Sequence, residues 1–149
     1  SLGRHRTEEL IHKIAQKEKA LIISGFAKGI DQTAHHSALL CGLDTLAFLP
    51  FGIEKIDTKW SSRPRFYYLS ETPAASGWES RWAILRNRLI AAFCDVLIVV
   101  QSMPDGGSFH TVRFANDYGK PVFALQSAED HFPGNSVLIE RGLARAFKI

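Results

Sequence analysis

Short apolar runs alternate along this chain with longer segments of helical periodicity, and this alternation limits the possible folds more than any other feature. The apolar runs lie at 20–24, 45–49, 95–100 and 122–125. Continuous apolar runs are typical of strands that are covered on both faces of a parallel sheet. Strands that alternate with helices form strand–helix–strand units. We therefore predict an α/β fold that is doubly wound, with a mostly parallel sheet inside a three-layer αβα sandwich.

The predicted elements follow one another along the whole chain. Helices are expected at 6–19, 31–40, 82–93, 109–118 and 136–146, and strands at 20–24, 45–49, 66–69, 95–100 and 122–125. Thr7 is the expected cap of the first helix, and Asn135 or Ser136 the expected cap of the last. The centre of the sheet should contain Ile22 and Val99. Doubly wound folds usually begin with a strand, whereas this chain begins with a helix, so we expect it to lack the first strand of its fold.

The composition is that of a globular domain. Of the 149 residues, 46% are hydrophobic and 22% are charged, and no linker or repeat divides them, so we expect one domain over residues 1–149. The net charge of +3 permits a polyanionic partner without requiring one. The apolar run at 96–100 is far too short to span a bilayer, and no charged-then-apolar leader opens the chain. Cys41 and Cys94 have no ligand spacing, which indicates two buried thiols in a reducing cytoplasm.

Two glycine-bearing turns follow predicted strands and open predicted helices. Ligands of open parallel sheets bind at the carboxyl ends of the strands, and helix N-termini favour anions. The first turn runs from Ser24 to Gly29 and carries Lys28, and the second contains Gly107 and Ser108. Neither turn has the dinucleotide or P-loop fingerprint. We expect the two turns to converge on one phosphate pocket, with an ordinary tight turn as the alternative for each.

The basic excess of the chain is concentrated between residues 55 and 88, where seven basic residues face three acidic ones. Arginines interleaved with aromatic residues are typical of surfaces that bind single-stranded nucleic acid. The alternative is a solvated helix face over core tryptophans. Arg86 and Arg88 are two residues apart on a helix and so do not share a face. We favour Arg86 as the phosphate contact, with the other arginine holding a carboxylate such as Asp31 or Asp95.

The sequence contains no recognisable metal-binding or catalytic set. His35 and His36 are adjacent, so on a helix they point about 100° apart. No group of Cys, His and carboxylate residues has ligand spacing, and no Gly-x-Ser-x-Gly elbow supplies a hydrolase nucleophile. We therefore expect no metal, no cofactor and no catalytic residue.

Five motifs, in their order and spacing, resemble one protein family. They are Ser-Gly-Phe-Ala-Lys-Gly-Ile-Asp at 24–31 with His35, Leu-Ser-Glu-Thr-Pro at 69–73, Arg-Asn-Arg-Leu-Ile at 86–90 followed by Asp95, Gly-Gly-Ser-Phe-His-Thr at 106–111, and Gly-Asn-Ser-Val-Leu-Ile-Glu-Arg-Gly at 134–142. Over nearly the whole chain they resemble the DNA-processing protein A family (DprA, also called Smf), within the SMF/LOG superfamily. The resemblance implies a Rossmann-like domain without the N-terminal helical and C-terminal winged-helix domains common in the family.

What the resemblance implies is binding rather than catalysis. Family members bind and protect single-stranded DNA, and they help to load a RecA-type recombinase during natural transformation, as homodimers in the cytoplasm. Carried over onto this sequence, the residues expected to bind DNA and its phosphates are Ser24, Gly25, Lys28, Gly29, Arg86, Asn87, Arg88, Gly107, Ser108 and Thr111. Three further motif positions are expected to be structural: Asp31, His35 and Asp95.

Two other functions stay open at this point. The sister LOG-type nucleotide phosphoribohydrolases carry Pro-Gly-Gly-x-Gly-Thr-x-x-Glu, which residues 104–111 partly match. Phe114 stands where their catalytic glutamate would be, and this weighs against the enzyme. The other alternative is a nucleotide-sensing module, for which a pocket without catalytic groups is expected.

Overall fold

The computed structural model describes all residues from 1 to 149. The chain divides into two compact units, Ser1–Arg86 and Asn87–Ile149, and the boundary falls within helix α4 (Ser80–Phe93). Both units are built from parallel strands joined by helices. None of the helices combines the length and the apolar character that crossing a bilayer would need.

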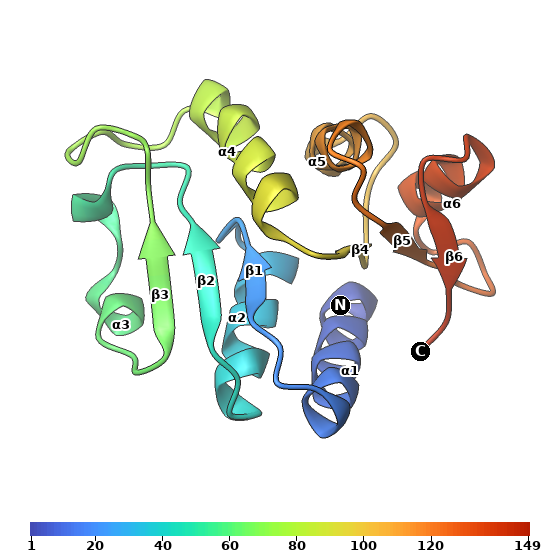
Figure 1. The fold of residues 1–149 in the computed structure, drawn as a ribbon, viewed down its shortest axis with the longest axis horizontal. Coiled ribbons are helices and arrows are strands. Elements are labelled where there is room, and N and C mark those ends of the chain that lie inside the picture. Colours follow the sequence, from blue (N-terminus) through green and yellow to red (C-terminus); the bar gives the residue numbers. More distant parts are fainter. The chain divides into compact units, whose positions relative to one another are not determined.

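The first unit contains a three-stranded parallel sheet in the order β1-β2-β3 (Figure 1). Its strands are β1 (Ile22–Ser24), β2 (Thr45–Phe48) and β3 (Phe66–Leu69). Ile22 pairs with Thr45, and Thr45 pairs with Phe66 on its other side. Because parallel strands end at the same edge of a sheet, the loops that follow β1, β2 and β3 all leave from one edge.

Helices cover one face of this sheet. α1 (Leu2–Lys17) packs on α2 (Ile30–Leu40), and α2 packs in turn on β1 and β2. Ile11, Ala38 and Leu43 form the buried contact between the two helices. After β2 the chain makes a short 3-10 helix, η1 (Ile53–Lys55), and a single turn, α3 (Thr58–Ser61).

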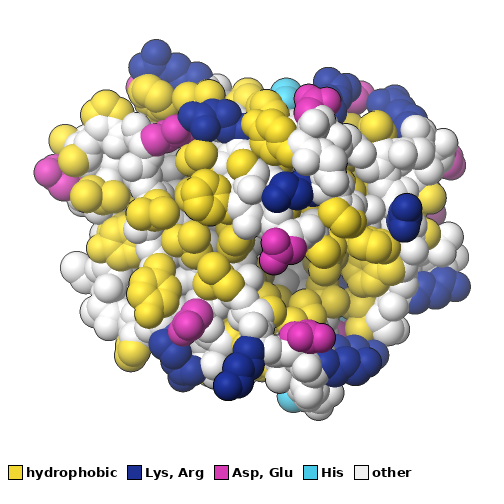
Figure 2. Space-filling view, viewed as in Figure 1, with side chains coloured by type: hydrophobic (Ala, Val, Ile, Leu, Met, Phe, Trp, Pro, Cys, Tyr) yellow, Lys and Arg dark blue, Asp and Glu magenta, His cyan; other side chains and the backbone are white.

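An aromatic cluster fills the same face of the sheet next to α3. The ring centroid of Phe26 lies 5.1 Å from that of Trp60 and 5.8 Å from that of Phe66. Side chains alternate along a strand, so Tyr67 and Leu69 point to the opposite face of the sheet, where both are about half exposed. Figure 2 shows hydrophobic side chains gathered over the region of β2 and β3.

The second unit contains a parallel sheet in the order β4-β5-β6. Its strands are β4 (Leu97–Val99), β5 (Val122–Leu125) and β6 (Arg145–Phe147), joined by α5 (Gly107–Asp117) and α6 (Pro133–Glu140). Val99, Val112, Ala124 and Leu138 come from four of these elements and are buried in one core. The apolar periodicity of α5 thus buries one face of the helix against its sheet.

The α/β class and the parallel strands are confirmed, and the strands at 66–69 and 122–125 have the predicted bounds. Within its own unit, Ile22 lies on β1 next to β2, and Val99 lies on β4 next to β5. The expected position of Ile22 and Val99 at the centre of one sheet stays a prediction.

The chain ends differ from the prediction as well. Thr7 does not cap α1, because the helix begins at Leu2 with Ser1 as its cap, and the Thr7 hydroxyl donates to the Gly3 carbonyl at 2.8 Å within the helix. The last predicted helix ends at Glu140, after which Gly142 adopts a φ of 71°. Arg145–Phe147 form β6 instead, a strand of three residues that is too short to show a strand period of its own. Cys94 is buried as predicted, whereas Cys41 is half-buried.

Candidate nucleic-acid interface

The first glycine turn connects β1 to α2 in the first unit. Ser24 ends the strand, and Gly29, with a φ of 101°, caps the helix. Phe26 also has a left-handed backbone, with a φ of 63°, and the burial of its ring in the aromatic cluster offsets the strain of that conformation. Lys28 is exposed at the outside of the turn. The turn thus presents a cation and the first amides of a helix to solvent, an arrangement that favours an anion.

The side chains of Asp31 and Arg86 fix this turn by hydrogen bonds to its backbone. The Asp31 carboxylate accepts from the backbone N–H of Ala27 at 3.1 Å. The Arg86 guanidinium donates to the carbonyls of Gly25 and of Phe48, the second at 2.9 Å. A Cβ added at Gly25 would lie 2.6 Å from the guanidinium carbon, so a larger residue there would require the Arg86 side chain to move.

Arg86 is only 7% exposed, and its burial lowers the pKa of the guanidinium, against the opposing effect of the Asp31 charge. Its bonds to two carbonyls fasten the turn after β1 to the end of β2. The structure therefore shows Arg86 in a supporting position, and its predicted contact with phosphate stays a prediction.

His35 is a further support of the same unit. Its side chain is 0% exposed, and Nδ1 lies 2.6 Å from the Thr45 hydroxyl, which in turn donates to the Ile22 carbonyl at 2.8 Å. The other ring nitrogen, Nε2, is buried without a hydrogen-bond partner. Burial lowers the pKa of His35 to about 4, although the Asp31 charge acts in the opposite direction. His35 is thus neutral at physiological pH and ties α2 to β1 and β2.

The second glycine turn lies in the second unit, between β4 and α5. Gly107 begins the helix and is exposed, with open space where a Cβ would be. Ser108 and Thr111 are half-buried on the first turns of the helix. The side-chain amide of Asn87 donates to the Gly107 carbonyl at 3.5 Å. This turn therefore also has an accessible helix N-terminus.

Asn135, predicted as a possible helix cap, lies inside α6 and organises this turn instead. Asn135, 1% exposed, donates to the carbonyls of Val99, Val100 and Leu125 at 2.9 to 3.2 Å and accepts from the Ser102 hydroxyl at 2.7 Å. Asparagine at a helix start usually indicates a cap, but here its amide joins the ends of β4 and β5. The sequence signal that could have indicated this role is the position of Asn135 in the motif at 134–142.

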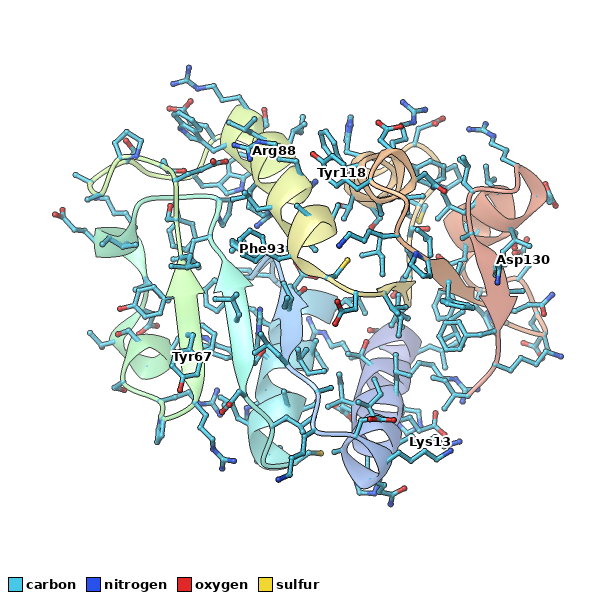
Figure 3. All side chains as sticks on the ribbon, viewed as in Figure 1. Lys13, Tyr67, Arg88, Phe93, Tyr118 and Asp130 are labelled. Carbon is cyan, nitrogen blue, oxygen red and sulfur yellow. The ribbon has the colours of Figure 1, made fainter.

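The candidate residues are divided between the two units. The first unit brings together Ser24, Gly25, Lys28, Gly29, Asp31, His35 and Arg86. The second unit holds Asn87, Arg88, Asp95, Gly107, Ser108 and Thr111. Arg88 is half-buried on α4 (Figure 3). Asp95 follows that helix and is exposed. The convergence of the two turns on one pocket stays a prediction. No group of three or more His, Cys, Asp and Glu residues is arranged to hold a metal ion.

Comparison with known proteins identifies relatives over most of the chain. Protein Smf from Synechocystis is 34% identical over an alignment of 128 residues, and the match covers 79% of this chain and 32% of that protein. The structure of DNA processing protein A from Streptococcus pneumoniae matches 99% of this chain and 54% of its own, with a TM-score of 0.84 and 30% identity. This match confirms the Rossmann-like fold.

A further solved relative is DNA processing protein A from Helicobacter pylori, whose structure is described together with its single-stranded DNA binding mode. It matches with a TM-score of 0.82 and 28% identity, over 97% of this chain and 68% of its own. The chain thus spans about one third of the Synechocystis protein and about half of the pneumococcal one. The family described as DNA recombination-mediator protein A matches all residues from 1 to 149, and the chain belongs to that family.

Proposed function

We propose that this chain binds single-stranded DNA through its sugar–phosphate backbone, with the turn from Ser24 to Gly29 as a phosphate contact. The observation that carries the proposal is the exposed Lys28 on a glycine turn that opens α2. Glycines allow a phosphate to approach the backbone closely, and the helix N-terminus favours its negative charge. The single-stranded DNA binding of the Helicobacter pylori relative supports the same chemistry here.

In this proposal the remaining residues have two kinds of role. Gly25, Arg86 and Asp31 position the first turn, since their contacts lie beneath it. Residues of the second unit add phosphate contacts of their own; these are Asn87, Arg88, Gly107, Ser108 and Thr111.

We further propose that binding occurs without a catalytic step. Phe114, where the related phosphoribohydrolases need a carboxylate, is half-buried and stacks on Tyr118 with 6.3 Å between ring centroids. A phenylalanine side chain cannot transfer a proton at a glycosidic bond. Four further properties stay predictions: loading of a RecA-type recombinase, a homodimeric state, a role in natural transformation and a cytoplasmic location. The description of the family as a recombination mediator supports the loading of a recombinase.

The test is a titration of fluorescently labelled oligo-dT with the native chain at low salt. Lys28→Ala should weaken binding about tenfold, because a charge-assisted phosphate contact is lost. Lys13→Ala, which removes an exposed lysine of α1 (Figure 3), should leave the affinity unchanged. Equal affinities of the Lys28→Ala variant and the native chain would contradict the assignment. Tighter binding of free nucleotides, or release of ribose 5-phosphate from AMP, would favour the sensor or the enzyme instead.

A further inference from the structure

The largest exposed aromatic ring of the first unit lies on the loop after β3. Trp78 is 62% exposed, whereas the other two tryptophans are half-buried in ring contacts. Trp60 belongs to the aromatic cluster, and the Arg81 guanidinium lies 4.7 Å from the ring of Trp82. Tryptophan offers a large ring with a polar N–H, so an exposed tryptophan is suited to contact with a partner.

The loop that carries Trp78 is fastened to the connection after β2. The N–H of Gly52 donates to the Ser76 carbonyl at 2.8 Å, and the N–H of Glu54 donates to the Ala74 carbonyl at 3.0 Å. Gly52 lies so close to the carbonyls of Pro73 and Ala74 that a Cβ would collide with them. Trp78 therefore lies two residues after Ser76, whose carbonyl is hydrogen-bonded to Gly52. Because this part of the loop is already fixed, less conformational entropy is lost when a partner orders Trp78.

The same connection contacts the phosphate turn. Phe51, which follows β2, packs its ring against that of Phe26 with 6.3 Å between centroids, and its carbonyl accepts from the Ser70 hydroxyl at 2.6 Å. The loops after β1, β2 and β3 thus interlock along the carboxyl edge of one parallel sheet. Lys28 belongs to the first of these connections and Trp78 to the third.

The charges next to Trp78 are compatible with a polyanion. Glu79 is the nearest acid in sequence, and its carboxylate accepts from Arg81 Nε at 2.6 Å. The paired arginine reduces the repulsion that this carboxylate would exert on a phosphate. Single-stranded nucleic acids are held by cations that contact the backbone and by aromatic side chains that stack on the bases. Lys28 and Trp78 supply one group of each kind on the same edge of the sheet.

We propose that Trp78 stacks on a nucleobase of the single strand whose phosphates lie at the Lys28 turn. This inference rests on the proposed function and adds to it a contact with a base rather than with the backbone. Stacking tolerates every base because each has a π-face, so Trp78 strengthens binding without selecting a sequence.

The experiment compares oligo-dT with an abasic oligonucleotide of the same length, which keeps the phosphates and lacks the bases. Trp78→Ala should weaken oligo-dT binding by about 5- to 150-fold, the range measured for loss of one stacked ring, and leave abasic binding unchanged. Trp78→Phe should restore most of the affinity. Tyr67→Ala removes a ring that is 55% exposed in the middle of β3 (Figure 3), and it should leave oligo-dT affinity unchanged.

The outcomes separate the two proposals. Unchanged oligo-dT binding by Trp78→Ala, or an equal loss on the abasic strand, would overturn the stacking role while leaving the phosphate site in place. Absence of binding to either oligonucleotide by the native chain at low salt would overturn both.

Discussion

At the residue scale, the amide of Asn135 joins the ends of two strands. Its nitrogen lies within hydrogen-bond distance of the carbonyls of Val99 and Val100, at the end of β4, and of Leu125, at the end of β5. A buried carbonyl without a partner carries the full cost of its desolvation. Asn135 therefore contributes to the order of the second unit more than its place at a helix start would indicate.

We predict that Asn135→Ala lowers the free energy of unfolding by about 3 kcal/mol, because several buried polar groups lose their partner at once. Asn116→Ala is the matched control. Asn116 also donates to two carbonyls, at 3.0 Å each, but it is exposed, so water replaces its bonds and the expected loss is below about 1 kcal/mol. Urea denaturation of the two variants measures both free energies of unfolding. Equal losses of unfolding free energy in the two variants would contradict the role of Asn135.

At the element scale, α2 is joined to its sheet by a buried histidine that is neutral in the folded chain. The Thr45 hydroxyl has one proton and gives it to the Ile22 carbonyl, so His35 Nδ1 must be the donor in their 2.6 Å contact. Burial lowers the pKa of His35 from 6.5 to about 4. The unfolded chain therefore binds more protons than the folded chain between these two pH values.

The stability contributed by neutral His35 is fully present above pH 6.5. It declines by about 3 kcal/mol in total as the pH falls toward 4. Denaturation midpoints measured across that range should show the decline. His35→Gln, which cannot titrate, should reduce it, whereas His36→Gln, an exposed neighbour, should keep it. A native slope retained in His35→Gln would mean that other groups cause the acid sensitivity.

The strands that could be predicted from the sequence are those whose own residues determine where they begin and end. β3 and β5 were predicted with correct bounds because apolar runs flanked by turn residues define both ends. β6 was missed because pairing with β5, and not its own pattern, makes Arg145–Phe147 a strand. Tertiary pairing of this kind leaves little trace in a local window.

At the scale of the whole molecule, the family and its candidate residues could be identified from five motifs, but the roles within them could not. Arginine commonly holds phosphates, so the sequence predicts Arg86 as a phosphate contact, and only the structure shows its guanidinium bonded to the carbonyls of Gly25 and Phe48. Lys28, by contrast, is exposed on the turn where the sequence placed it. The role of each side chain depends on whether it is exposed and on which distant residues it contacts. The residue type alone gives neither.

The central claim is that the chain holds single-stranded DNA by its phosphates, and the salt dependence of oligo-dT affinity tests it most directly. Each phosphate contact releases counterions, so the logarithm of the affinity should fall linearly with the logarithm of the salt concentration. The account predicts a steep negative slope for the native chain and a slope about 0.7 units shallower for Lys28→Ala, the value for one single-strand contact. An affinity that does not change with salt, or a slope that Lys28→Ala leaves unaltered, would contradict it.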